Sequence, residues 1–135
     1  MYFDKQMNDL LKLDIRQLNP LTLAFIGDAV YELFVRTHIL NEKSQMSPHK
    51  MHVEAIKYVK AHSQSEIIKR IQDDLTEEEM YFFKKGRNAK SGTVPKNADV
   101  QEYRFATGFE CLLGYLYVTQ NNERLEYILD KVISN

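Results

Sequence analysis

The fold is decided by NPLTLAFIGDAVYELFVRTHIL, residues 19–40. Asn19 can accept hydrogen bonds from the free N–H groups of a first helical turn, and Pro20 suits the first helical position because its missing N–H needs no partner there. The apolar residues that follow are too dense for a helix with a wide solvent-exposed face. The stretch predicts one long, largely buried helix with apolar residues Leu23, Phe25, Ile26, Ala29, Val30, Leu33 and Phe34.

Gly27 and Asp28 interrupt this apolar pattern at its centre. A carboxylate between LAFIG and AV is expensive to bury without a partner. A glycine inside a helix costs about 0.5–1 kcal/mol relative to alanine. Two local rules are therefore broken at adjacent positions, and such breaks tend to mark functional sites.

Composition points to an ordinary soluble protein. The chain has 135 residues, 44% of them hydrophobic and 27% charged, which predicts a single domain spanning residues 1–135. The net charge of −1 means that a polyanionic partner would need a local basic patch. The single Cys111 excludes an internal disulfide, and no apolar run has transmembrane length, so a cytoplasmic location without membrane contact is expected.

Helical patterns cover most of the chain, and no strand pattern is found. Ser47 with Pro48 repeats the capping device of the long helix, and Thr76 with Glu79 forms a capping box. The expected helices cover residues 3–13, 19–40, 48–62, 63–71, 77–85, 101–120 and 123–133, with one irregular stretch at 86–99. This order predicts an all-α fold in which two central apolar helices pack inside a ring of amphipathic ones.

Glu110 is a second isolated carboxylate, in the apolar run FATGFECLLGYLYV at residues 105–118. Gly108 and Gly114 lie close to it, as Gly27 lies beside Asp28. Glycines let two helices approach closely, so the two carboxylates would repel each other unless a hard divalent cation such as Mg²⁺ joined them. The alternative is that each acid forms a structural ion pair or a cap.

A basic stretch occupies residues 84–96, KKGRNAKSGTVPK, and contains no acid. It precedes the helix of Glu110, which favours a role in binding phosphate groups. The alternative is a solvated loop without function, as most charged runs are. Ser91 and Thr93 add neutral hydrogen-bonding groups, and the candidate phosphate-binding residues are Lys84, Lys85, Arg87, Asn88, Lys90 and Lys96.

The motifs LAFIGDAVYELFV and FATGFECLLGYLYV together resemble the ribonuclease III family. With GRNAKS and YRFATGFE in one short chain, the sequence is similar to the Mini-ribonuclease III form, which lacks the separate double-stranded-RNA-binding domain. The resemblance covers nearly the whole chain. It implies the all-α fold of the ribonuclease III endonuclease domain.

This resemblance implies roles for the two isolated acids. Asp28 matches the family's catalytic aspartate, and Glu110 matches its catalytic, metal-binding glutamate. Larger family members carry further acids where this chain has Leu21, Ala24 and Thr107. The acidic cluster is therefore leaner, which leaves open the number of metal ions and whether Thr107 takes part.

The resemblance also implies a function: a Mg²⁺-dependent endoribonuclease, with Mn²⁺ as a substitute, that cleaves double-stranded RNA. It implies a homodimer, a role in maturing the 23S ribosomal RNA precursor, and a large-subunit ribosomal protein that presents the RNA. The basic stretch would then contact phosphates of a duplex that is read mainly by shape. The alternatives are a nuclease-like module that binds structured RNA without cutting it and a helical protein-binding adaptor.

Other polar residues give weaker signals. Glu32 lies one turn after Asp28 and could support the site, but an ion pair with Arg36 is favoured. His49 and His52 are three residues apart with no third metal ligand evident nearby in the sequence. These two histidines are interpreted as surface or packing residues, and His38 and His62 are equally unpersuasive as ligands.

Overall fold

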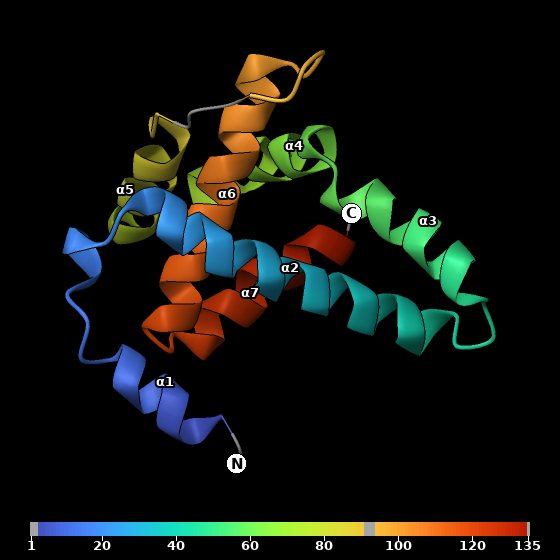
Figure 1. The fold of residues 1–135 in the computed structure, drawn as a ribbon, viewed down its shortest axis with the longest axis horizontal. Helices are drawn as coiled ribbons and strands as arrows, with labels where there is room; N and C mark the ends of the chain where they lie inside the picture. The colour runs from blue at the N-terminus through green and yellow to red at the C-terminus, as the bar shows by residue number, and fades with distance from the viewer. Residues whose placement is uncertain (1–2, 91–93, 135) are drawn as a thin grey trace.

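A computed structural model describes residues 3–90 and 94–134, and within these ranges the chain forms helices and no strand (Figure 1). The α-helices are α1 (Asp4–Leu10), α2 (Pro20–Glu42), α3 (Pro48–Val59), α4 (Ala61–Ile71), α5 (Glu77–Arg87), α6 (Val100–Val118) and α7 (Asn122–Ile133). Short 3₁₀ turns lie at η1 (Ile15–Gln17) and η2 (Gln72–Asp74). The predicted all-α class is confirmed. None of the described helices is long and apolar enough to cross a membrane.

Local capping signals set the starts of three helices as predicted. The Asn19 side chain accepts a hydrogen bond from the Leu21 N–H at 2.8 Å and begins α2. Ser47 caps α3 in the same way. Thr76 and Glu79 form the complete capping box of α5, with the two reciprocal hydrogen bonds at 3.0 and 3.1 Å. These starts are fixed by residues adjacent in sequence, which is why they could be predicted.

Some boundaries differ from the prediction. The first helix is shorter than residues 3–13, because α1 ends at Leu10 and buries none of its residues. Lys60 adopts an extended backbone, with φ −63° and ψ 150°, so the break before α4 falls there and His62 lies inside α4. The Asp99 side chain accepts a hydrogen bond from the Glu102 N–H at 3.1 Å, so α6 begins at residue 100.

Helix α6 lies at the centre of the core and contacts α2, α4, α5 and α7. The α2 helix crosses it in Figure 1, and the two backbones touch at this crossing. A Cβ atom on Gly27 would lie 1.8 Å from the carbonyl oxygen of Glu110, and one on Gly114 would lie 1.9 Å from that of Leu23. Only glycine fits at either position without moving the helices apart.

Helix α2 is buried on one side only. Leu23 and Tyr31 are fully covered, whereas Phe25 is 79% exposed, Leu33 is 69% exposed and Leu40 is also exposed. The prediction that α2 lies inside a ring of helices is therefore wrong for the single chain. The dense apolar pattern combines a core face with a second, uncovered apolar face, which we call the α2 apolar strip (Phe25, Leu33 and Leu40).

A buried ion pair joins α5 to α7. Glu79 is only 1% exposed, and its two carboxylate oxygens accept hydrogen bonds from Arg124 at 2.7 and 2.8 Å. Burial by itself raises the pKa of Glu79, but the hydrogen bonds from Arg124 and the Thr76 backbone outweigh burial and hold the pKa below its usual range. The charge of Glu79 is thus satisfied inside the protein.

Candidate active site

Asp28 on α2 and Glu110 on α6 meet where these helices cross. Their carboxyl groups lie within hydrogen-bonding reach of each other. The contact between backbones at Gly27 and Gly114 makes this possible, because Gly27 precedes Asp28 directly and packs against the Glu110 backbone. The two acids singled out in the sequence are therefore brought together, 82 positions apart in the chain.

Asp28 differs from expectation in its exposure. Its apolar neighbours suggested a buried carboxylate, but Asp28 is exposed and Glu110 is partly covered. The reason is that Phe25, three residues before Asp28, and Ala29, directly after it, are themselves exposed on the open side of α2. The acidic pair therefore has one covered member and one member that solvent and a ligand can reach.

The pair has an unusual charge balance. Burial and then the neighbouring charge of Asp28 raise the pKa of Glu110 to about 8, and a hydrogen bond from Gln64 opposes this shift. Near neutral pH, the second negative charge is unfavourable unless a proton or a cation compensates it. A site that strongly shifts the pKa of a carboxyl group is a candidate for function.

Gln64 on α4 supports Glu110 and was not singled out in the sequence. The side chain is 2% exposed, and its amide nitrogen donates to the Val59 carbonyl oxygen at 2.8 Å and to the Glu110 carboxylate at 3.4 Å. Its Oε1 atom is buried and has no hydrogen-bond partner among the described residues. Gln64 thus fixes the covered side of the Glu110 carboxylate.

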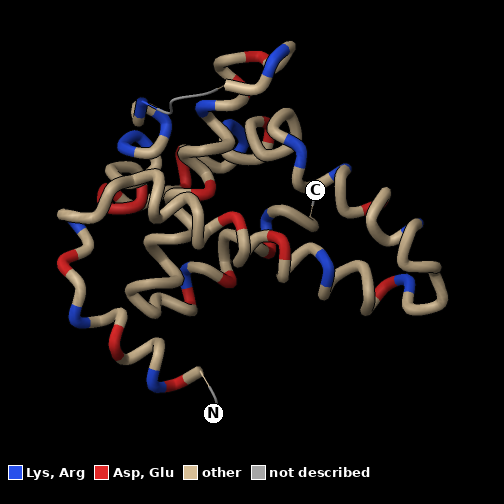
Figure 2. The backbone as a smooth tube through the Cα atoms, viewed as in Figure 1, with Lys and Arg blue, Asp and Glu red and all other residues tan. Residues whose placement is uncertain are grey.

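Some of the predicted phosphate-binding residues lie at the end of α5, where Figure 2 shows a group of Lys and Arg residues. Lys84, Lys85 and Arg87 lie in its last turn, Asn88 caps it, and Lys90 and Lys96 lie in the connection to α6. Ser91, Gly92 and Thr93 of the same stretch lie outside the described residues. Lys84, Asn88, Lys90 and Lys96 are exposed. Lys85 instead donates to the Arg16 carbonyl oxygen at 2.8 Å and so anchors the segment before α2.

The end of α5, which carries part of this basic surface, packs against α6. Gly86 packs against Gly108 and Cys111 of α6, which flank Glu110 in sequence. Arg87 lies over the rings of Phe83 and Phe105, at 5.6 and 5.9 Å from the ring centroids. The α5 end is therefore held against the turn of α6 that includes Glu110.

The ribonuclease III domain model matches residues 21–121, a segment that includes both Asp28 and Glu110. The chain belongs to the ribonuclease III family. It is an endoribonuclease of the ribonuclease III type, the class that acts on double-stranded RNA.

Similar proteins support this assignment over almost the full chain. A Mini-ribonuclease 3 from Clostridium tetani is 51% identical over 126 residues, covering 93% of this chain and 83% of that protein. One from Thermoanaerobacter sp. is 54% identical over 121 residues, covering 90% and 84%. A crystal structure from Fusobacterium nucleatum is 35% identical with a TM-score of 0.80, covering 89% of this chain and 95% of that one. The ribonuclease III resemblance and its helical fold are confirmed.

Ribonuclease III enzymes use divalent metal ions, and the Asp28–Glu110 pair fits such an ion. Both donors are carboxylates, the ligands that hard divalent cations prefer. A cation between them would also relieve the repulsion that raises the pKa of Glu110. Asp28 is open to solvent, so the pair can be reached from outside.

Glu32 adds negative charge near this ribonuclease III pair and also has a partner of its own. Its carboxylate accepts from the Arg36 Nε at 3.2 Å, the ion pair that the sequence favoured. Its charge still contributes to the raised pKa of Glu110, after burial and Asp28. The Thr107 hydroxyl donates a hydrogen bond to the Tyr103 carbonyl oxygen at 3.0 Å, so its hydrogen is used within α6.

Proposed function

We propose that this ribonuclease III is a Mg²⁺-dependent endoribonuclease in which Asp28 and Glu110 form the catalytic, metal-binding pair, with Mn²⁺ as a substitute. Residues 1–135 act as a single catalytic domain. The observation that carries the proposal is the meeting of these two carboxyl groups where α2 and α6 cross. When bound, the cation activates water for attack on the phosphodiester and stabilises the charge that develops on its oxygens.

The chain's own residues divide the work of this site. Asp28 and Glu110 hold the cation through their carboxylates. Gln64 fixes the covered oxygen of Glu110 from α4, and the Gly27–Gly114 crossing sets the separation of the two helices. Because Leu21, Ala24 and Thr107 supply no carboxylate, Asp28 and Glu110 are the acids on which metal binding rests.

The substrate is double-stranded RNA, bound through its phosphates by the basic surface. Lys84, Asn88, Lys90 and Lys96 are exposed there, and Arg87 is held beside them on aromatic rings. A-form duplexes are recognised mostly by shape and by phosphate and 2′-hydroxyl contacts. Lys85, whose ammonium group is already bonded to the Arg16 carbonyl, contributes charge and anchors the surface.

The protein acts as a homodimer that pairs the α2 apolar strip of two copies. Phe25 and Leu33 are large side chains left in solvent on one helix, and a two-fold axis lets the same surface cover itself. Two copies would provide one acidic pair for each strand of a duplex. Sedimentation equilibrium should show a dimer, and a fully active monomer would rule this interface out.

The biological substrate is the 23S ribosomal RNA precursor in the bacterial cytoplasm, presented by a large-subunit ribosomal protein. This step rests on the similarity to the Mini-ribonuclease 3 proteins. Incubating purified protein with precursor RNA, with and without total large-subunit proteins, tests both points. Cleavage confined to the ends of the 23S sequence is expected.

A labelled RNA duplex incubated with Mg²⁺ or with EDTA tests the central proposal. Cleavage should require Mg²⁺ and should be lost in Asp28→Asn, while the control Asp130→Asn, an exposed acid on α7, should cut normally. Normal cleavage by folded Asp28→Asn would remove Asp28 from the site. Tight duplex binding by the wild-type protein without any cleavage would instead support the non-cutting RNA-binding module.

A further inference from the structure

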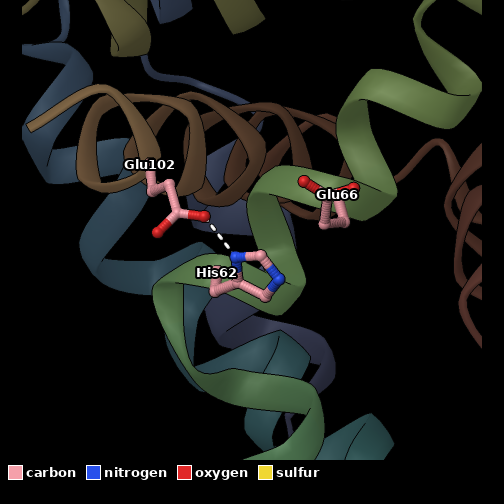
Figure 3. A group of neighbouring side chains, drawn as sticks. All are labelled: His62, Glu66 and Glu102. Carbon is pink, nitrogen blue, oxygen red and sulfur yellow. Dashed lines mark hydrogen bonds and ion pairs between the residues drawn. The ribbon is translucent and has the colours of Figure 1, made fainter. Parts of the chain in front are cut away.

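A second group of metal-ligating side chains lies outside the acidic pair (Figure 3). His62 and Glu66 are one turn apart on α4, and Glu102 reaches toward them from the first turn of α6. The Nδ1 atom of His62 contacts the Glu102 carboxylate directly. One nitrogen or oxygen atom from each residue lies within 4.8 Å of the other two.

This cluster is separate from the Asp28–Glu110 pair. Glu102 lies eight residues before Glu110, which corresponds to about 12 Å along α6. On α4, Gln64 points inward to Glu110, whereas His62 and Glu66 are exposed on the outer side of the helix. The two groups therefore share only α6: the acidic pair is completed by α2, and this cluster is completed by α4.

The ligand chemistry also differs from that of the acidic pair. An imidazole nitrogen with two carboxylate oxygens suits Zn²⁺ and other first-row transition metals, whereas Mg²⁺ prefers oxygen ligands alone. Two carboxylates and a neutral imidazole carry a charge of −2, which matches a divalent cation. His62 is 60% exposed and Glu102 is 26% exposed, so an ion has access and could keep water in its remaining positions.

We propose that His62, Glu66 and Glu102 form a second cation site that binds a transition metal of the Zn²⁺ class. The ion joins the beginning of α4 to the beginning of α6, the helix that carries Glu110. The competing explanation is an ion pair between protonated His62 and Glu102. That ion pair does not need Glu66. A contribution of Glu66 to metal binding therefore distinguishes the cation site from the ion pair.

Calorimetric titration with ZnCl₂ provides the test. The double variant Asp28→Asn/Glu110→Gln serves as the background, because it removes the carboxylates of the other site. This background should bind one Zn²⁺ per chain. Adding either Glu66→Gln or Glu102→Gln should weaken binding by more than the roughly 10- to 100-fold that loss of an outer-shell partner costs.

His52→Ala is the matched control, because His52 is another exposed histidine, on α3, and lies three residues from His49. It should leave Zn²⁺ affinity in the same background unchanged. Loss of binding in His52→Ala, or unchanged binding in Glu66→Gln, would overturn the proposal. Circular dichroism in EDTA should show that all these variants are folded.

Histidine-ring NMR spectra of the wild-type protein give an independent readout. Zn²⁺ should shift the His62 ring signals at substoichiometric amounts, and excess Mg²⁺ should not reverse the shift. No saturable shift at His62, or a shift that Mg²⁺ reverses, would overturn the site. Since these measurements do not depend on cleavage, failure here leaves the proposed nuclease site intact.

Discussion

Glu79 on α5 is a buried glutamate and Glu110 on the neighbouring α6 is a partly buried one, but their partners carry opposite charges. Glu79 receives two hydrogen bonds from Arg124, and its pKa lies below its usual range. Glu110 faces another carboxyl group, and its pKa is raised to about 8. Arg124 neutralises the charge of Glu79 within the fold. The charge of Glu110 has no cationic side chain as a partner among the described residues and needs a proton or a metal cation. Glu79 therefore stabilises the fold, whereas the Glu110 carboxylate is available to bind a cation.

The largest contrast is expected from Glu110→Gln. Loss of this charge should lower kcat for duplex cleavage by about 100-fold or more, the scale on which loss of one group stabilising a transition state acts. The melting temperature in EDTA at neutral pH should not fall, because a pKa of about 8 leaves Glu110 mostly protonated without metal, and glutamine is likewise neutral. Single-turnover cleavage and thermal unfolding measure the two effects. A folded variant with normal Mg²⁺-dependent kcat would contradict the assignment of Glu110.

Glu79→Gln should show the reverse behaviour. Removing one partner of a buried ion pair costs about 3–5 kcal/mol, and we expect about 2–3 kcal/mol here because the partly exposed Arg124 can reach water. Chemical denaturation gives this difference. Cleavage per folded molecule should be retained, since Glu79 lies away from the acidic pair. Glu126→Gln, at an exposed position on α7, is the control and should change stability by less than about 0.5 kcal/mol.

The same ion pair predicts a pH dependence. The folded pKa of Glu79 lies below the usual value of 4.5, so its stabilising contribution is present above pH 4.5 and is lost as the pH falls through the folded pKa. The stability difference between wild type and Glu79→Gln should therefore shrink in acid. Denaturant titrations from neutral pH down to acid test this, and a difference that stayed constant would argue against a charged Glu79.

Gln64→Leu tests how much the hydrogen bond from Gln64 contributes to metal binding by Glu110. The leucine keeps most of the volume but removes the amide that holds the carboxylate, and loss of such an outer-shell partner costs roughly 10- to 100-fold in metal affinity or activity. We expect a loss near the lower limit, because the bond to Glu110 is long at 3.4 Å. Mg²⁺-dependence curves should move to higher Mg²⁺, and an unchanged curve would limit Gln64 to packing.

The smallest expected effect concerns Arg87 and Lys90. Replacing both by alanine should weaken duplex binding and lower the log–log salt slope by up to about 0.9 for each phosphate group that is no longer neutralised, on the B-DNA scale. Sequence preference should not change, since phosphate-binding groups position a protein without reading bases. Fluorescence titrations in Ca²⁺ at several salt concentrations test this. Unchanged affinity and slope would indicate a solvated surface without function.

The sequence predicted the parts of this structure that depend on neighbouring residues. Asn19 with Pro20 and Thr76 with Glu79 begin helices because their hydrogen bonds span only a few positions. The two isolated acids could be identified because each lies alone in an apolar run. Their contact was expected from the glycines beside them, and the family resemblance supported it.

Other features depend on contacts between distant segments. The apolar pattern of α2 could not distinguish a core face from the exposed α2 apolar strip. The contact between His62 and Glu102 joins residues 40 positions apart. Gln64 did leave a signal, because it lies on the same face of α4 as the buried residues Ile67, Ile68 and Ile71. A polar residue on an apolar stripe indicates a buried hydrogen-bonding role.

The contact of backbone with backbone at Gly27 and Gly114 makes the separation of Asp28 and Glu110 independent of side-chain packing elsewhere. Conservative substitutions among the other core residues can lower or raise the free energy of unfolding, but they leave this backbone contact in place. Activity per folded molecule and resistance to unfolding are therefore separable properties of this nuclease. In a variant library selected for thermal stability, many conservative substitutions should be tolerated in the rest of the core, whereas only glycine should be tolerated at positions 27 and 114.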